Sequence, residues 1–92
     1  MAMCKTIFQL AETDSVEEIL TTFSQEYFSK HTEAYLLEDA TYAIDAGEND
    51  LRAVHDESTC TIKFIARYEK DIQRYDKKLL SFANKNNVNI SD

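Results

Sequence analysis

The residue types best suited to metal binding lie close together between positions 55 and 60. His55, Asp56, Glu57 and Cys60 place an imidazole, two carboxylates and a thiol within six residues. A zinc site needs three or four such ligands that converge on one point. Adjacent residues of a helix point in different directions, and His55 and Cys60 are five positions apart rather than four. We therefore interpret the cluster as a polar linker beside a small buried thiol, and we expect no metal and no cofactor.

Nucleophilic catalysis would require a cysteine thiolate beside a histidine and a group that orients the imidazole. The chain has two cysteines, Cys4 and Cys60, and two histidines, His31 and His55, and no local spacing pairs them. Adjacent carboxylates are ordinary surface in an acidic chain. A single glycine excludes a glycine-rich loop that binds phosphate. We expect no catalytic residues, and we expect an enzyme only if folding brings a histidine to a cysteine.

A series of cations in the second half of the chain could bind an anion. If residues 63–78 are helical, the series lies on one side and forms a row roughly 20 Å long. Such a row can hold the phosphates of a nucleotide or a nucleic acid. The competing interpretation is a solvated outer face or a contact with the acidic half of the protein. The candidate anion-binding residues are Lys63, Arg67, Lys70, Arg74 and Lys77, with Lys78 beside them.

The charge of the chain is divided unevenly. Residues 1–57 carry 13 acidic and 3 basic side chains, a net charge of −10. Residues 58–92 carry 4 acidic and 7 basic side chains, a net charge of +3, so the whole chain has −7. Either the two halves attract each other within the fold, or one of them meets a charged partner.

The acidic half favours a binding protein over an enzyme. A small acidic protein can present carboxylates where a basic partner would bind phosphates. We therefore expect an inhibitor or regulator of a protein with a basic surface, including one that binds nucleic acid. Capture of an anionic ligand on the basic series is the alternative. The candidate protein-binding residues are Glu33, Glu38, Asp39, Asp45, Glu48 and Asp50, and Asp56 and Glu57 follow them.

The stretch 51–82 carries the longest helical pattern. Apolar or small residues recur every three or four positions from Leu51 to Phe82, opposite the basic series. This spacing predicts a long helix that ends near residue 85 and is continuous over 68–84. Two short helices would not cover its apolar side, so we expect a homodimer or larger homo-oligomer. The expected oligomer seam is Ile65, Tyr68, Ile72, Tyr75, Leu79 and Phe82.

Two further helices are expected in the first half. Ser15 and Glu18 form a capping box, and apolar residues then follow at helical spacing, which predicts a helix over 16–29. The alanine-rich stretch 32–46 predicts a second helix, which would end at Gly47. The alternative for this stretch is a hairpin with strands at 34–37 and 41–45. We prefer the helix because the residues between these strands lack two-residue turn chemistry.

The expected fold is mainly α, a small three- or four-helix bundle. One glycine and no proline disfavour a turn-rich β architecture. The alternative is an α+β fold with short strands near 3–9 and 59–66, because both stretches also alternate as strands do. We expect one domain over 1–86 and a flexible polar tail over 87–92.

Nothing in the chain predicts secretion or a membrane span. The first 13 residues lack an apolar run of signal length, and no segment approaches the roughly 18 apolar residues that a span requires. We therefore expect a cytoplasmic protein with reduced cysteines and no membrane partner. The acceptor motif for glycosylation at 89–91 is then a chance match.

Overall fold

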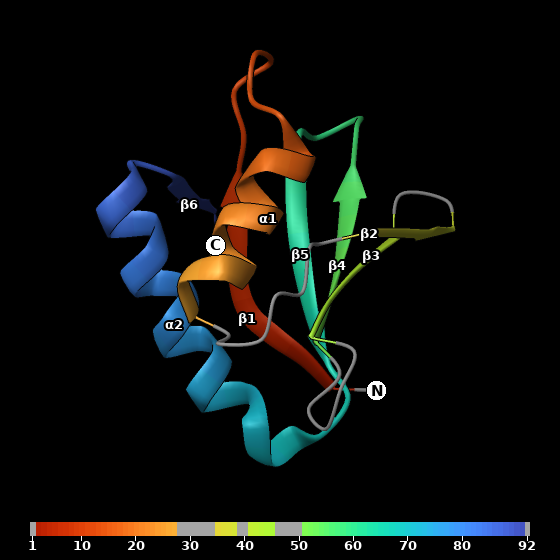
Figure 1. Ribbon diagram of the computed structural model, residues 1–92, viewed down its shortest axis with the longest axis vertical. Helices are drawn as coiled ribbons and strands as arrows, with labels where there is room; N and C mark the ends of the chain where they lie inside the picture. The colour runs from red at the N-terminus through yellow and green to blue at the C-terminus, as the bar shows by residue number, and fades with distance from the viewer. Residues whose placement is uncertain (1, 28–34, 39–40, 46–50, 92) are drawn as a thin grey trace.

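The structure is a computed structural model that describes residues 2–27, 35–38, 41–45 and 51–91, with only the backbone described for 2, 35–38 and 45. Four consecutive strands separate the two α-helices along this part of the chain, and both helices lie on one face of a sheet (Figure 1). The elements are β1 (Ala2–Gln9), α1 (Val16–Tyr27), β2 (Tyr35–Glu38), β3 (Thr41–Asp45), β4 (Leu51–Asp56), β5 (Thr61–Ala66), the 3-10 helix η1 (Glu69–Asp71), α2 (Ile72–Asn86) and β6 (Asn89–Ser91).

The six strands form a single antiparallel sheet in the order β2-β3-β4-β5-β1-β6. The prediction of a mainly α fold and a helical bundle is therefore wrong. The alternative, an α+β fold with strands near 3–9 and 59–66, describes the arrangement that is observed.

Residues 51–66 contain two strands where the helical spacing predicted one helix. Buried side chains recur at every second position at the start of β4, at Leu51 and Ala53, and through β5, at Ile62, Phe64 and Ala66. This two-residue alternation is the period of a strand with one covered face. The apolar spacing of three and four residues over 51–66 does not reflect a helix. It runs through the turn between β4 and β5, where no single element continues.

The predicted helix over 32–46 is also wrong. Residues 35–38 and 41–45 form the antiparallel pair β2 and β3, close to the hairpin that we considered as the alternative. Tyr42 and Ile44 alternate inward and are buried, and this burial outweighs the helix propensity of the alanines. The expected cap at Gly47 lies outside the described residues.

Both α-helices begin or end where their local chemistry predicts. Helix α1 begins at Val16, and the Ser15 hydroxyl accepts a hydrogen bond from the Glu18 N–H at 3.4 Å, which is one half of the capping box. After η1, α2 continues to Asn86 and ends at Asn87, which adopts the left-handed conformation with φ 57°. Asparagine tolerates this conformation better than most residues. The prediction of a continuous helix over 68–84 is wrong at its start, because Tyr68 is extended, residues 69–71 form a 3-10 turn and the α-helix begins at Ile72.

The apolar side of α2 is covered by the protein's own sheet. Tyr75, Leu79 and Phe82 are at most 1% exposed and pack with Phe8 and Phe64 from β1 and β5. The rings of Phe8 and Phe64 are 4.9 Å apart in an edge-to-face arrangement, which adds about 1 kcal/mol beyond area burial. A homodimer was expected because these apolar residues needed a surface to cover them. The protein's own sheet covers them, so they no longer give a reason to expect a homodimer.

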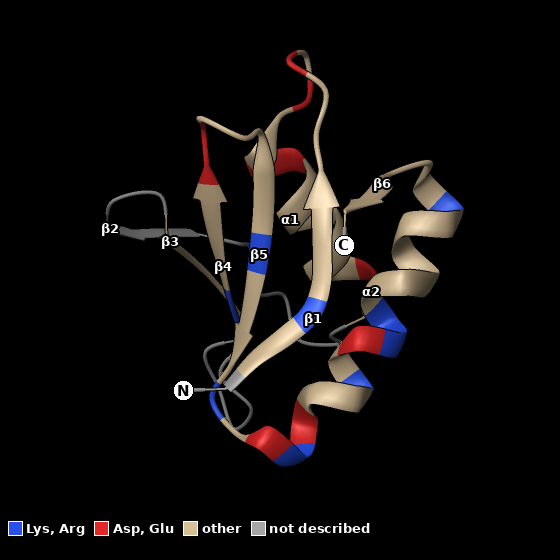
Figure 2. Ribbon diagram, turned by 180° about the vertical axis from the view of Figure 1, so that it is seen from behind, with Lys and Arg blue, Asp and Glu red and all other residues tan. Residues whose placement is uncertain are grey.

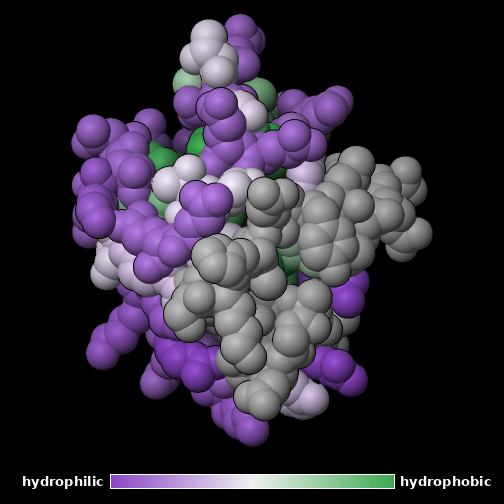
Figure 3. All heavy atoms as spheres, viewed as in Figure 1, coloured by the Kyte–Doolittle hydropathy of each residue, from purple (hydrophilic) through white to green (hydrophobic). Residues whose placement is uncertain are grey.

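The remaining seam residues are more accessible. Ile65 lies on the sheet face opposite the helices, Ile72 is half-buried, and Tyr68 is exposed. Figure 3 shows the helix side of the molecule, where the described surface is largely hydrophilic and apolar residues show in gaps.

The end of the chain adds a strand to the sheet. Asn89–Ser91, inside the segment expected to be a polar tail, forms β6 and pairs with Ile7, Phe8 and Gln9 of β1. Strand β6 is only three residues long, so the first half of β1 has β5 as its only paired neighbour strand within the described sheet.

The Asp76 carboxylate accepts hydrogen bonds from the part of β1 that β6 is too short to reach. Strand β1 has three residues between its pairs Met3–Ile65 and Ile7–Lys63, where β5 has one, so β1 bulges. Within the bulge, the N–H groups of Lys5 and Thr6 donate to the Asp76 oxygens at 3.4 and 3.1 Å, and the Thr6 hydroxyl donates at 2.9 Å. A side chain of α2 therefore satisfies backbone donors that a strand would otherwise satisfy.

Replacing Asp76 with Ala should lower the free energy of unfolding by about 2 kcal/mol, because it leaves buried donors of Thr6 without an acceptor. Urea denaturation followed by circular dichroism measures this change. Asp76→Asn retains one acceptor oxygen and should lose less. Glu69→Ala, at an exposed acid of η1, serves as the control and should stay within about 0.5 kcal/mol. Equal effects of Asp76→Ala and Glu69→Ala would contradict the role of Asp76.

Candidate functional site

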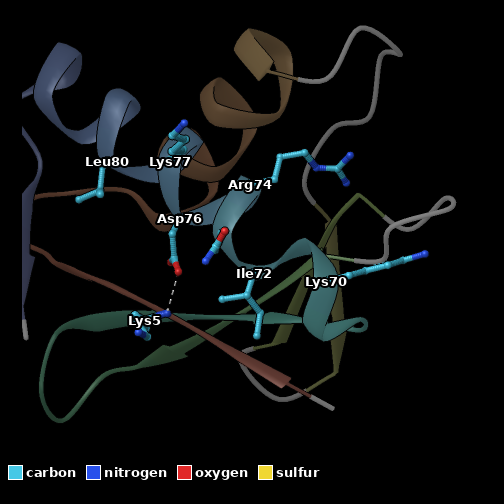
Figure 4. Close-up of a pocket in the computed structure, with 8 residues that line it drawn as sticks. Lys5, Lys70, Ile72, Arg74, Asp76, Lys77 and Leu80 are labelled. Carbon is cyan, nitrogen blue, oxygen red and sulfur yellow. Dashed lines mark hydrogen bonds between the residues drawn. The ribbon is translucent and has the colours of Figure 1, made fainter.

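A groove of about 610 Å³ lies between the bulged part of β1 and the first turns of α2 (Figure 4). Strand β1 contributes one lining residue, η1 contributes one, and α2 contributes the others. Four of the eight lining residues are cations and one is a carboxylate. The lining residues are Lys5, Lys70, Ile72, Gln73, Arg74, Asp76, Lys77 and Leu80.

The folding of each element directs its cation outward. Lys5 is exposed between Cys4 and Thr6, which are buried, because side chains alternate along β1. On α2, the burial of Tyr75 and Leu79 against the sheet leaves Arg74 and Lys77 on the solvent side. The groove is therefore basic because the apolar residues of both elements are used in the core.

The lining carboxylate is bound to the backbone of β1 and forms no ion pair with a lining cation in the described structure. Both oxygens of Asp76 already accept hydrogen bonds from the bulge of β1. Neither Lys5 nor Lys77 forms an ion pair with any residue of the described segments. These two ammonium groups are thus available to a ligand.

Arg74 is held in place by Asp71 of η1 and by Tyr75 of its own helix. Its guanidinium lies 3.2 Å from Asp71 Oδ1 and 5.3 Å from the centre of the Tyr75 ring. Asp71 is 7% exposed, and its second oxygen, Oδ2, is buried without a hydrogen-bond partner within the described structure. The side chain of Arg74 is 48% exposed, so it can still contact a ligand.

An exposed aromatic ring adjoins the groove. Tyr68 is 41% exposed and precedes η1 in an extended conformation. The Lys70 ammonium, which lines the groove, lies 5.4 Å from the centre of this ring, and the Arg67 guanidinium lies 5.5 Å from it. Tyr68 therefore shares a cation with the groove.

Three of the five predicted anion-binding residues meet in this site. Lys70, Arg74 and Lys77 line the groove, while Lys63 lies on the helix-free face of β5 and Arg67 follows β5. The site also includes Lys5, which no spacing could connect with α2 because it is 65 positions before Lys70. The only local signal was its alternation with apolar neighbours.

The predicted acidic surface cannot be compared with the structure residue by residue. Glu33, Asp39, Glu48 and Asp50 lie outside the described residues. Glu38 and Asp45 end β2 and β3, and their side chains are not described. The structure does show another acidic region at the start of α1 and in the loop before it, as Figure 2 shows in red. Its exposed residues are Glu12, Asp14, Glu17 and Glu18.

His55 and Cys60 line a second, smaller hollow of about 180 Å³ beside the loop that follows β1. Cys60 has a φ of 55°, which is uncommon for a residue other than glycine, in the turn between β4 and β5. Its carbonyl accepts from the Leu10 N–H at 2.8 Å, and its thiol contacts the Glu57 carbonyl at 3.7 Å. The thiol thus points to a backbone oxygen, and the described residues hold no group of three potential metal ligands.

The same turn is stabilised by Asp56. Its Oδ1 accepts hydrogen bonds from the Ser58 hydroxyl at 2.6 Å and from the Ser58 N–H at 3.0 Å. These bonds favour the ionised carboxylate and lower the pKa of Asp56. Asp56 and Glu57, which the sequence suggested as metal ligands or surface acids, therefore serve first as turn residues.

Cys4 lies behind the groove wall and differs from Cys60. It is 2% exposed, and its burial, together with the nearby Asp76 charge, raises the pKa of its thiol to about 12. Both cysteines are free thiols. Cys4 is therefore protonated at neutral pH and acts as a small apolar core residue.

The chain matches no protein-family model, and no curated protein or solved structure matches it. In the described part of the chain, neither α-helix has the length and apolar content needed to cross a bilayer. The function must therefore be argued from the groove itself.

A thiol-specific disulfide reagent at pH 8 should distinguish the two cysteines. We expect Cys60 to react in the native protein and Cys4 to react only after denaturation, because the Cys4 thiol is buried and its pKa lies far above the pH. Cys60→Ser should remove the fast reaction, and Cys4→Ser should keep it. A fast reaction that persists in native Cys60→Ser would contradict the burial of Cys4.

Proposed function

We propose that this protein is a non-enzymatic binding module that captures an anionic ligand, a nucleotide or a nucleic acid, in the groove between β1 and α2. One observation supports the proposal above the others. Cations from three elements, Lys5, Lys70, Arg74 and Lys77, line one groove, and the only carboxylate among its described lining residues is hydrogen-bonded to the β1 backbone. An ordinary solvated face of an acidic protein would intersperse its cations with free carboxylates.

The electrostatics of the whole chain limit how such a ligand binds. A net charge of −7 repels anions at long range, so attraction must come from contacts within the groove. Contacts between phosphates and lysine or arginine release counterions, and affinity then falls steeply with salt. We therefore expect moderate affinity that is detectable mainly at low ionic strength.

Replacing Lys5 and Lys77 together with Gln should weaken the binding of a single-stranded oligonucleotide. Loss of two phosphate contacts should reduce the slope of log K against log salt by about 1.4. Fluorescence anisotropy with a labelled oligonucleotide, at several salt concentrations, measures both quantities. The same titration with ATP tests whether a single nucleotide suffices.

Lys85→Gln provides the matched control for this experiment. Lys85 also lies on α2, but it pairs with Glu26 of α1 and is not a lining residue of the groove. Its replacement should change the affinity by less than about twofold. If Lys85→Gln weakens binding as much as the double variant, binding depends on overall charge and the groove is not the site.

A second candidate function rests on the acidic region before and within the first turn of α1. Glu12, Asp14, Glu17 and Glu18 are all exposed there, on the helix side of the molecule. This arrangement favours an inhibitor or regulator that binds the basic surface of another protein. Glu33, Glu38, Asp39, Asp45, Glu48 and Asp50 would extend the same acidic surface if they lie near it.

Charge reversal separates the two parts of that acidic surface. We expect Glu12→Lys with Glu17→Lys to weaken the binding of a lysine-rich peptide at low salt at least fivefold, because attraction becomes repulsion. Reversal of Glu38, Asp39, Asp45 and Glu48 tests the other part. Isothermal titration calorimetry measures the affinities, and unchanged binding in both variants would rule out this second function.

We further propose that the protein acts in the cytoplasm. Its two cysteines are free, as cytosolic conditions maintain them, and neither is near enough to a described cysteine to form a disulfide.

A further inference from the structure

We propose that the ligand of the groove is a single-stranded nucleic acid, one base of which stacks on Tyr68 while the adjoining phosphates contact the groove cations. This inference rests on the proposed function, since it names the chemical class of the captured anion. It uses a feature that anion capture alone does not require, the exposed ring at the end of the groove.

Tyr68 is unusual among the aromatic residues of the described segments. The other described aromatic side chains are buried or half-buried, and most of them pack in the core. Tyr68 alone among them is exposed, at 41%. A tyrosine ring has an apolar face and a polar hydroxyl end, and this combination is enriched at binding surfaces.

The surroundings of this ring suit a nucleotide base. Arg67 and Lys70 place their cationic groups 5.5 and 5.4 Å from the ring centre. Cation–π contacts at exposed positions are weaker than the stacking of a base on an aromatic side chain. A base can therefore displace a cation from the ring, and the displaced cation remains within reach of the phosphate attached to that base.

Lys70 connects the ring with the groove, because its ammonium lies 5.4 Å from the centre of the Tyr68 ring and its side chain lines the groove. From Lys70, the lining cations follow along α2 as Arg74 and then Lys77. Lys5 lies opposite them on β1 (Figure 4). A ligand that fits must combine flat rings with regularly spaced anionic groups. Base faces are hidden by stacking inside a duplex, so a single strand is the form that fits.

An acidic peptide is the principal competitor. Leu80 is 45% exposed and lines the groove with Ile72, so apolar side chains of a peptide could also find contacts. The peptide would satisfy the cations and leave the Tyr68 ring without a specific role. We favour nucleic acid because it accounts for the ring and the cations together.

The experiment compares two labelled oligomers of about 12 units, an oligothymidylate and an abasic oligomer with the same phosphate backbone. The full-length protein is titrated with each by fluorescence anisotropy at low salt. We expect the base-bearing oligomer to bind about tenfold more tightly than the abasic one. Tyr68→Ala should remove this difference, and Tyr68→Phe, which keeps the stacking surface, should retain it. RNA oligomers in parallel show whether the natural source is RNA or DNA.

Each other outcome has a definite meaning. Equal binding of the two oligomers to the unmodified protein overturns this inference and leaves anion capture intact; this comparison needs no variant to fold. Binding of a peptide of alternating Glu and Leu, with neither oligomer bound, overturns the inference in favour of an acidic protein partner. If no oligomer, ATP or acidic peptide binds at low salt, both this inference and the proposed function fail.

Discussion

The contact between the Asp76 carboxylate and the bulge of β1 is the constraint on which the candidate site depends. A bulge turns consecutive N–H groups away from the neighbouring strand, and β6 is too short to receive them. Their hydrogen bonds to Asp76 attach α2 to β1 at this point. The same bonds direct the carboxylate to the β1 backbone rather than into an ion pair, so one interaction fixes the groove wall and leaves Lys5 and Lys77 without a salt bridge in the described structure.

The packing of the core explains why charges of one sign gather in the groove. Both helices lie on one sheet face, where Phe23 of α1 and Phe82 of α2 pack with Phe8 and Phe64 of the sheet. Once these faces are buried, the polar sides of α2 and β1 must point to solvent beside one another. The cations of Lys5, Arg74 and Lys77 are thus brought together by the burial of their neighbours, and their mutual repulsion is moderated by water.

A separate acidic region lies at the start of α1 and in the loop before it. Exposed carboxylates cluster at the start of α1, where they also suit the positive end of the helix dipole. Figure 2 shows carboxylates without cations near the first turn of α1 and after the ends of β1 and β4, whereas along η1 and α2 cations lie among the carboxylates of Glu69, Asp71 and Asp76. A chain with an overall negative charge can therefore still present a locally basic surface to a ligand.

The sequence by itself determined the local features that depend on a few adjacent residues. These were the start of α1 at its Ser15 cap, the helix through Tyr75 and Leu79, and the outward direction of Lys70, Arg74 and Lys77. The sequence also indicated the strands at β1 and β5, as the alternative to a mainly α fold. Such features follow from capping and from periodicity within one element, which neighbours in the chain control.

Only the tertiary structure decided between helix and strand over residues 35–38, 41–45 and 51–66 and assembled the groove. Short apolar runs fit either period, and the pairing of β3 with β4, β4 with β5 and β5 with the distant strand β1 selected the extended form. The tertiary structure also brought Lys5 to α2, since that neighbour is set by sheet order and by the Asp76 hydrogen bonds. Contacts between residues about 70 positions apart leave no local pattern, so no reading of spacing could have predicted this site.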